Sequence, residues 1–149
     1  MAYLAIIASI FIGEFMIKEL VEKYVKNGEK KLILKEKLFL TKYHNHGAAL
    51  NFMEKKKGLV AFISVLLSLV CTILFFITLT KEGKEPLKLS LAFLLGGAYS
   101  NTYDRLKRKY VVDYVGFHHK KKRKTEIIYN LSDFCIILGA MFSALFGVK

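Results

Sequence analysis

Residues 58–80 read GLVAFISVLLSLVCTILFFITLT, a run without one charged side chain. The hydrocarbon core of a bilayer is about 30 Å thick, which takes about 20 residues of α-helix to cross. This stretch therefore predicts a membrane-spanning helix, and it sets the fold class expected for the rest of the chain.

Three further stretches have the same character. The first, 1–17, is apolar except for Glu14; the second, 87–103, is interrupted only by Lys88 near its start; and the last, 127–148, carries a single charge, Asp133. The connection 81–86 is short and polar, so the two helices that it joins should form an antiparallel hairpin. We predict an all-α membrane protein, residues 1–149 forming one integral-membrane domain with four transmembrane helices at about 1–18, 58–80, 87–104 and 126–148.

The composition supports this class because charged and apolar residues are segregated. The chain of 149 residues is 54% hydrophobic and 24% charged. A soluble domain would interleave the two at helical or strand period, so a soluble globular enzyme is excluded. The net charge is +12, and most of the Lys and Arg that produce it lie in the connections between the apolar spans. At these positions anionic lipid head groups are a nearer partner than nucleic acid. We expect membrane lipids, and no nucleic acid, among the partners.

The long connection 18–57 has its own pattern. Two apolar triplets, Leu32-Ile33-Leu34 and Leu38-Phe39-Leu40, are separated by a Lys-Glu-Lys triplet. Short apolar runs of this kind between polar residues predict strands. We therefore expect a small β-like extramembrane cradle between the first and second helices.

Polar side chains mark the ends of the later spans. Asp133 follows Asn130 by three residues within the last predicted span, a spacing that places both on the same helix face. The third span ends in Asn101, Asp104 and Arg105, with Asp104 expected to pair with Arg105. Because the helices are antiparallel neighbours, these groups and Asp113 can meet at one membrane surface.

Two carboxylates brought together at an interface cannot both ionise at low cost. One keeps its proton while the other acts as a base towards water, as in aspartic proteases. The sequence favours this interpretation for Asp113 and Asp133. The structural alternative is that Asp133 only pairs with Arg105 while Asp113 is a solvated acid in a loop.

At these residues the chain resembles the lipoprotein signal peptidases (signal peptidase II), a family of small four-helix membrane aspartyl proteases. A GGxxxNxxDR pattern matches Gly96 to Arg105, and a VVDF-like segment matches Val111 to Tyr114. An FNxAD motif corresponds to Tyr129 to Asp133, and an NxGxAF segment to Asn45 to Leu50. Glu14 and Lys18 match an acid four residues before a lysine in the first helix.

This resemblance implies an aspartic endopeptidase that removes the signal peptide from prolipoproteins, just before their diacylglyceryl-modified cysteine. Asp113 and Asp133 would be the catalytic dyad. The resemblance also implies residues that support the dyad or bind substrate, namely Asn45, Gly47, Asn101, Asp104, Arg105, Asn130, Glu14 and Lys18. The protein would act as a monomer in the bacterial cytoplasmic membrane, with its active site on the extracytoplasmic side, and would need no cofactor.

The chain departs from the family pattern at several positions. Glu14 stands where an aspartate is usual, Ser132 replaces an alanine, Tyr114 and Tyr129 replace phenylalanines, and Leu50 replaces an aromatic residue. These differences keep open an alternative, a non-catalytic or re-purposed paralogue that binds lipoproteins or anionic lipid head groups.

The distribution of Lys and Arg opposes the orientation that the family implies. Residues 18–57 hold eleven and residues 105–125 hold nine of the 24 Lys and Arg. The positive-inside rule would place these segments, and the active site, in the cytoplasm. We keep the family orientation as the prediction, since the motifs concern chemistry and the rule concerns loop statistics.

The histidines do not form a metal-ligand pattern. They occur as two short pairs without a cysteine or an acid at a ligand-like spacing, namely His44, His46, His118 and His119. We expect no metal site.

Overall fold

The computed structural model describes residues 1–149 except 36, 49–50, 118–126 and 148–149. Leu50, His118 and His119 therefore lie outside the described residues. The chain forms four long helices, α1 (Ala2–Tyr24), α2 (Lys57–Leu79), α3 (Glu85–Lys107) and α4 (Leu131–Gly147). Four strands, β1 (Lys31–Ile33), β2 (Leu38–Asn45), β3 (Val111–Phe117) and β4 (Ile128–Tyr129), form one sheet, and a short 3-10 turn, η2 (Glu54–Lys56), precedes α2.

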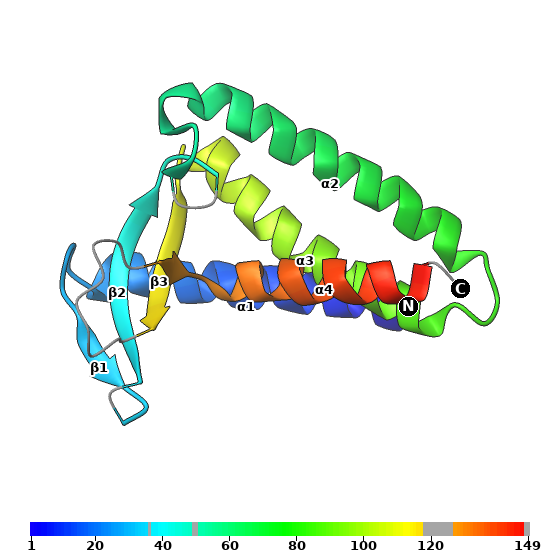
Figure 1. Ribbon diagram of the computed structural model, residues 1–149, viewed down its shortest axis with the longest axis horizontal. Helices are drawn as coiled ribbons and strands as arrows, with labels where there is room; N and C mark the ends of the chain where they lie inside the picture. The colour runs from blue at the N-terminus through cyan, green and yellow to red at the C-terminus, as the bar shows by residue number, and fades with distance from the viewer. Residues whose placement is uncertain (36, 49–50, 118–126, 148–149) are drawn as a thin grey trace.

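Helix α3 lies at the centre of the bundle and packs against the three other helices. In Figure 1, α1 and α4 overlap along the horizontal direction, α2 and α3 run obliquely to them, and both chain termini lie at the end remote from the sheet. Small residues bring α3 and α4 close: a Cβ added at Gly97 would overlap the Ser132 carbonyl, and one added at Gly139 would overlap the backbone at Leu94. These glycines permit the close packing of the two helices.

The sheet is antiparallel, with strand order β1-β2-β3-β4. It lies across one end of the helices (Figure 1), and β3 is buried along most of its length. Val112 and Tyr114 of β3 pack with Val21 and Val25 at the end of α1, so this small core joins the sheet to the bundle. The predicted triplets 32–34 and 38–40 lie in or beside the hairpin β1–β2, whereas β3 and β4 were not predicted as strands.

Two helix ends differ from the predicted spans. Helix α1 continues to Tyr24, past residue 18, because Lys18 is buried within the protein and does not mark an interface. Helix α4 begins at Leu131, since Ile128 and Tyr129 pair with β3 and Asn130 caps the helix. The expectation that Asn130 shares a helix face with Asp133 is therefore wrong.

By length and composition, among the described residues one helix is long and apolar enough to cross a membrane, namely Glu54–Leu79 with mean hydropathy 2.9. Helix α4 is a shorter apolar helix. Helices α1 and α3 are interrupted by buried charged side chains, among them Glu14, Lys18 and Asp104. The fold is thus a mostly helical bundle with a small sheet at one end.

Candidate active site

Asp113 and Asp133 come from different elements and meet through one asparagine. Asp113, in β3, is 2% exposed and accepts a hydrogen bond from Asn130 Nδ2 at 2.7 Å. Asp133, in the first turn of α4, accepts one from the Asn130 backbone N–H at 3.1 Å. Asn130 Oδ1 in turn accepts from the Asp133 N–H at 2.9 Å, which is a capping box at the start of α4. The single residue Asn130 therefore holds both carboxylates.

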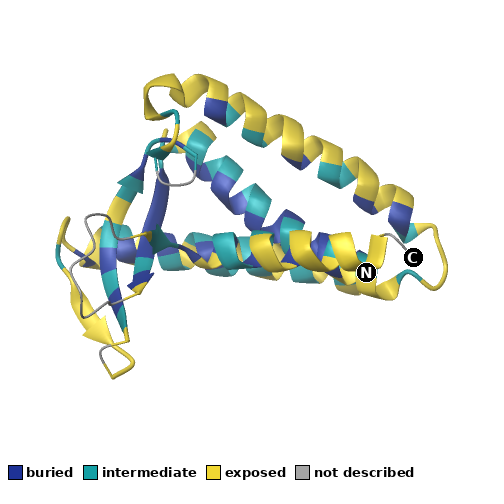
Figure 2. Cartoon of the chain, in the orientation of Figure 1, coloured by how far each residue is buried: buried dark blue, intermediate teal, exposed yellow. Residues whose placement is uncertain are grey.

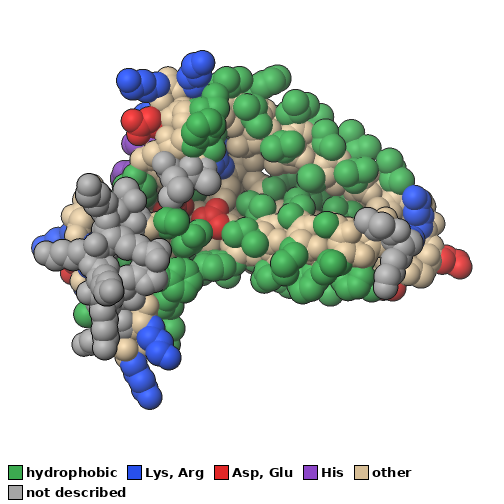
Figure 3. Space-filling view, in the orientation of Figure 1, with side chains coloured by type: hydrophobic (Ala, Val, Ile, Leu, Met, Phe, Trp, Pro, Cys, Tyr) green, Lys and Arg blue, Asp and Glu red, His purple; other side chains and the backbone are tan. Residues whose placement is uncertain are grey.

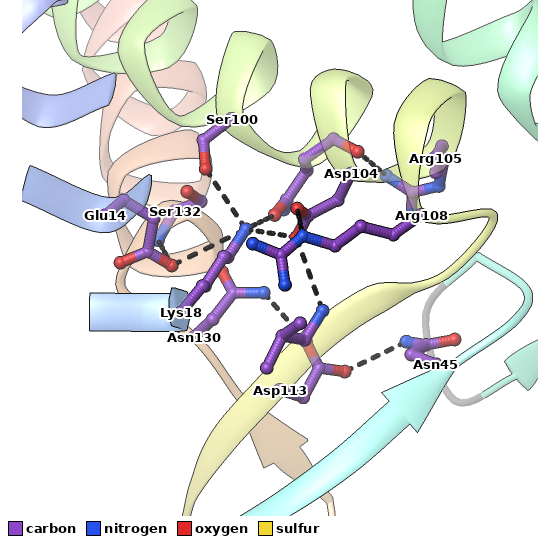
Figure 4. Close-up of polar contacts among 12 residues, drawn as sticks. Glu14, Lys18, Asn45, Ser100, Asp104, Arg105, Arg108, Asp113, Asn130 and Ser132 are labelled. Atoms are coloured by element: carbon purple, nitrogen blue, oxygen red, sulfur yellow. Dashed lines mark hydrogen bonds and ion pairs between the residues drawn. The ribbon is translucent and has the colours of Figure 1, made fainter. Parts of the chain in front are cut away.

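Each carboxylate has a second amide donor. Asn45, at the end of β2, donates to Asp113 Oδ2 at 3.1 Å, and Asn101 of α3 donates to Asp133 Oδ1 at 2.9 Å. Figure 4 shows Asn45 and Asn130 on either side of Asp113. The alternative in which Asp113 is a solvated loop acid is wrong, because Asp113 is buried in a strand.

Gly47 fixes the orientation of Asn45. The Gly47 N–H donates to Asn45 Oδ1 at 3.1 Å, which leaves the amide Nδ2 of Asn45 for Asp113. A Cβ at residue 47 would overlap the backbone of Asn51 and Phe52, so a glycine is needed for this loop to close. The Gly47 carbonyl accepts from Arg105 Nη2 at 3.3 Å, which joins the loop to α3.

A cavity of about 300 Å³ lies beside the two acids. Its polar lining comes from Asn45, Arg105, Asp113 and Asp133, and Ile127 with side chains from β3, β4 and α4 forms the rest. A larger cavity, about 700 Å³, lies at the other end of the bundle, but its one acid, Glu85, is bonded to Tyr3 and Lys88. The smaller cavity is therefore the candidate active site, because two acids and several apolar side chains line it.

The environment of Asp113 favours its protonated form. Burial raises the pKa of Asp113 to about 7, and the charge of Asp133 adds to this, while the hydrogen bonds from Asn45 and Asn130 oppose it. Near neutral pH the pair can thus hold one proton between two carboxyl groups. Such a pair can accept a proton from water and donate one to a leaving group.

Behind the two acids lies a buried charged network centred on Lys18. Its ammonium group is fully buried and contacts Asp104 Oδ2 at 2.9 Å, Ser100 Oγ at 3.1 Å and Glu14 at 3.7 Å. It also donates to Asn101 Oδ1 at 2.9 Å. Because this bond fixes the Asn101 amide, Lys18 directs the Nδ2 group of Asn101 towards Asp133.

The predicted pairing of Asp104 with Arg105 is wrong. Asp104 pairs with Lys18 and, at 3.0 Å, with Nε of Arg108, four residues on. Adjacent helical residues point in different directions, whereas residues four apart lie on one face. Arg105 instead donates to the carbonyls of Asn101 and Gly47, both at 3.3 Å.

The structure adds residues that the sequence analysis did not single out for the site. Arg108 and Ser100 complete the network of Asp104 and Lys18, and the Tyr114 hydroxyl donates to Glu14 at 2.8 Å. The four-residue spacing from Asp104 to Arg108 was a signal that could have found Arg108. His44 lies 2.8 Å from Glu22 and stacks on Tyr110, away from the two acids.

These features define the class first: a helical bundle whose polar site, with two acids, lies where the helices meet a small sheet. The model of the family described as signal peptidase (SPase) II matches residues 6–148. The chain therefore belongs to the signal peptidase II family, a family of proteases, and the family predicted from the motifs is confirmed.

Relatives named lipoprotein signal peptidase align with most of this chain. The lipoprotein signal peptidase of Clostridium tetani is 30% identical over 85% of this chain and 80% of its own length. That of Geobacillus kaustophilus is 31% identical over 95% of this chain and 89% of its own. A solved structure of a bacterial membrane enzyme shares the fold, with a TM-score of 0.86 at 20% identity over 99% of this chain and 88% of that chain.

Proposed function

We propose that this chain removes signal peptides from lipid-modified prolipoproteins as an aspartic endopeptidase, with Asp113 and Asp133 as its catalytic dyad. Membership of the signal peptidase II family supports the activity. The observation that carries the dyad is that one residue, Asn130, hydrogen-bonds to both carboxylates beside a partly apolar cavity.

The reaction would use one proton shared by the dyad. The ionised carboxylate takes a proton from a water molecule, and the resulting hydroxide forms a bond to the carbonyl carbon of the scissile peptide. The protonated carboxyl hydrogen-bonds to the carbonyl oxygen and then donates its proton to the amine as the C–N bond breaks. The products are a signal peptide with a new carboxyl end and a lipoprotein whose modified cysteine is the new N-terminus.

Arg105 would help to hold the substrate. Its side chain lines the cavity between the two acids, and its Nε is buried without a hydrogen-bond partner among the described residues. A buried donor of this kind is costly unless a ligand group satisfies it. A backbone carbonyl of the substrate would supply that acceptor.

The alternative of a non-catalytic paralogue is not favoured. Both carboxylates are present, and each accepts two hydrogen bonds. A chain that only binds lipoproteins would not need this paired arrangement.

The membrane arrangement is also part of the proposal. All four helices, α1 to α4, would span the bilayer of the bacterial cytoplasmic membrane as one domain, with lipids around a monomer. The sheet and the dyad would lie at the extracytoplasmic surface. The apolar exposed surface of α2 and the polar network inside α1 and α3 support this arrangement.

The test is cleavage of a diacylglyceryl-modified precursor peptide by purified protein in detergent. Asp113→Asn and Asp133→Asn should each reduce kcat/KM by at least about 100-fold, as expected for loss of a general acid or base. Glu82→Gln, an exposed acid in the loop between α2 and α3, is the matched control and should keep full activity. Full activity in either aspartate variant would show that the dyad is wrong.

A further inference from the structure

Tyr114 is next to Asp113 in β3 but faces the other way. Successive strand residues point to opposite faces of a sheet, so Asp113 faces the cavity while Tyr114 faces α1. Tyr114 is 6% exposed and packs against Val21 and Val25. Its hydroxyl donates to Glu14 Oε2 at 2.8 Å, and Glu14 is fully buried.

The same two side chains hold the start of α4. The first N–H groups of a helix have no partner within the helix, and a negative charge there is favourable. The Leu131 N–H donates to the Tyr114 hydroxyl at 3.1 Å, and the Ser132 N–H donates to Glu14 Oε1 at 3.4 Å. These are the two residues immediately before Asp133, so Tyr114 and Glu14 act on the backbone that carries the second acid.

The contacts therefore connect the two halves of the site. Tyr114 lies one residue from Asp113 in the strand, and its hydroxyl contacts a residue two positions before Asp133 in the helix. Glu14 adds a connection from α1, where it is also 3.7 Å from Lys18. Two carboxyl groups share a proton only at a fixed separation, and a misplacement of about 1 Å can cost about 100-fold in rate.

From this geometry we infer that Tyr114 and Glu14 are positioning residues, which hold β3 and the start of α4 at the separation that Asp113 and Asp133 need. The inference rests on the proposed dyad. It also accounts for two departures from the family pattern, because the Tyr114 hydroxyl donates to Glu14 although the two residues lie far apart in the sequence. Glu14, which is longer than the usual aspartate, contacts both the Tyr114 hydroxyl and the Ser132 N–H at the start of α4.

Tyr114→Phe tests the inference by removing only the hydroxyl. We expect kcat to fall about 10-fold or more while KM stays within about twofold, because the distance between the acids changes and the cavity does not. The matched control is Tyr99→Phe, which removes a hydroxyl bonded to Thr72 between α3 and α2, away from the acids. The control should keep both constants within about twofold.

Glu14→Asp provides a second, independent variant. The shorter side chain cannot reach Tyr114 and the Ser132 N–H together, so the same selective loss of kcat is expected. The double variant Glu14→Asp/Tyr114→Phe should lose no more activity than the worse single variant, because both changes break one connection. Losses that multiply, a change in KM alone, or kcat values equal to that of Tyr99→Phe would overturn the inference.

Asp133→Asn in the same assay separates this inference from the proposed function. If Asp133→Asn is inactive while Tyr114→Phe and Glu14→Asp match the control, the dyad stands and the positioning role is wrong. If Asp133→Asn retains full activity, the dyad itself is wrong and the inference fails with it.

Discussion

At the scale of single residues, the pKa of Asp113 predicts how kcat/KM depends on pH. Its pKa is raised to about 7, first by burial and then by Asp133, so Asp113 is protonated below pH 7 and loses its proton above it. If Asp113 is the member of the pair that holds the proton, kcat/KM falls as pH rises, with a midpoint near 7. With the ionisation of the second carboxyl on the acid side, the profile should be bell-shaped.

Asn45 provides a check on this assignment. Its hydrogen bond favours the ionised form and lowers the pKa of Asp113, so Asn45→Ala should move the alkaline midpoint to higher pH. The measurement is kcat/KM from pH 5 to pH 9 on the precursor peptide, with the exposed Asn27→Ala as control. A flat profile, or a midpoint that moves to lower pH, would contradict the role of Asp113.

Ser132 and Ser100 should respond in opposite ways to replacement by alanine. The Ser132 hydroxyl is buried without a hydrogen-bond partner among the described residues, whereas the Ser100 hydroxyl accepts from Lys18. Removing an unpaired buried hydroxyl avoids a desolvation cost of about 1–3 kcal/mol, while removing a paired one leaves its partner unsatisfied. Ser132→Ala should therefore raise the Tm in detergent and Ser100→Ala should lower it, and the opposite order would contradict these contacts.

At the scale of elements, the close contact of α3 with α4 controls the position of Asp133. A Cβ at Gly97 would overlap the Ser132 carbonyl and crowd Cys135 and Ile136, so α4 must move if residue 97 is alanine. Gly97→Ala should cost about 1–3 kcal/mol of stability and reduce kcat at least about 10-fold.

Gly13→Ala is the matched control for this change. A Cβ at residue 13 of α1 meets nothing within 4 Å, so the substitution should raise stability by about 0.5–1 kcal/mol through helix propensity alone. Thermal unfolding in detergent and cleavage rates measure both effects. If Gly97→Ala and Gly13→Ala have the same thermal stability and the same cleavage rate, the α3–α4 contact does not constrain the site.

The elements also show what could be predicted from the sequence. Helical runs and the β1–β2 triplets carry local patterns, so they were recognisable in residues 58–80 and 32–40. Strand β3 was not, because Val111 to Phe117 forms a strand only by pairing with β2, some seventy residues earlier. The role of Lys18 at Asp104 likewise depends on how α1 packs on α3, which local spacing does not contain, whereas the four-residue spacing from Asp104 to Arg108 does contain that pair.

At the scale of the whole molecule, the exposed apolar side chains indicate whether water or lipid surrounds each helix. Figure 2 shows α2 exposed along most of its length, and in Figure 3 hydrophobic side chains cover this helix. Of the most apolar window of this helix, 17% is buried within the protein. A surface this apolar is unfavourable in water and suits a lipid environment.

The orientation of the protein in the membrane can be measured directly. The result decides between the family topology, with the sheet end outside the cytoplasm, and the positive-inside rule, which places it in the cytoplasm. The sheet end includes residues 18–57, with eleven of the 24 Lys and Arg, yet the proposed dyad lies there. We predict, from the orientation that the family resemblance implies, that the sheet end is extracytoplasmic. In a variant with Cys71 and Cys135 replaced by serine, Asn27→Cys should react with a membrane-impermeant maleimide in intact cells. Glu82→Cys, in the loop at the opposite end, should react only after the membrane is permeabilised. The reverse pattern would place the dyad in the cytoplasm.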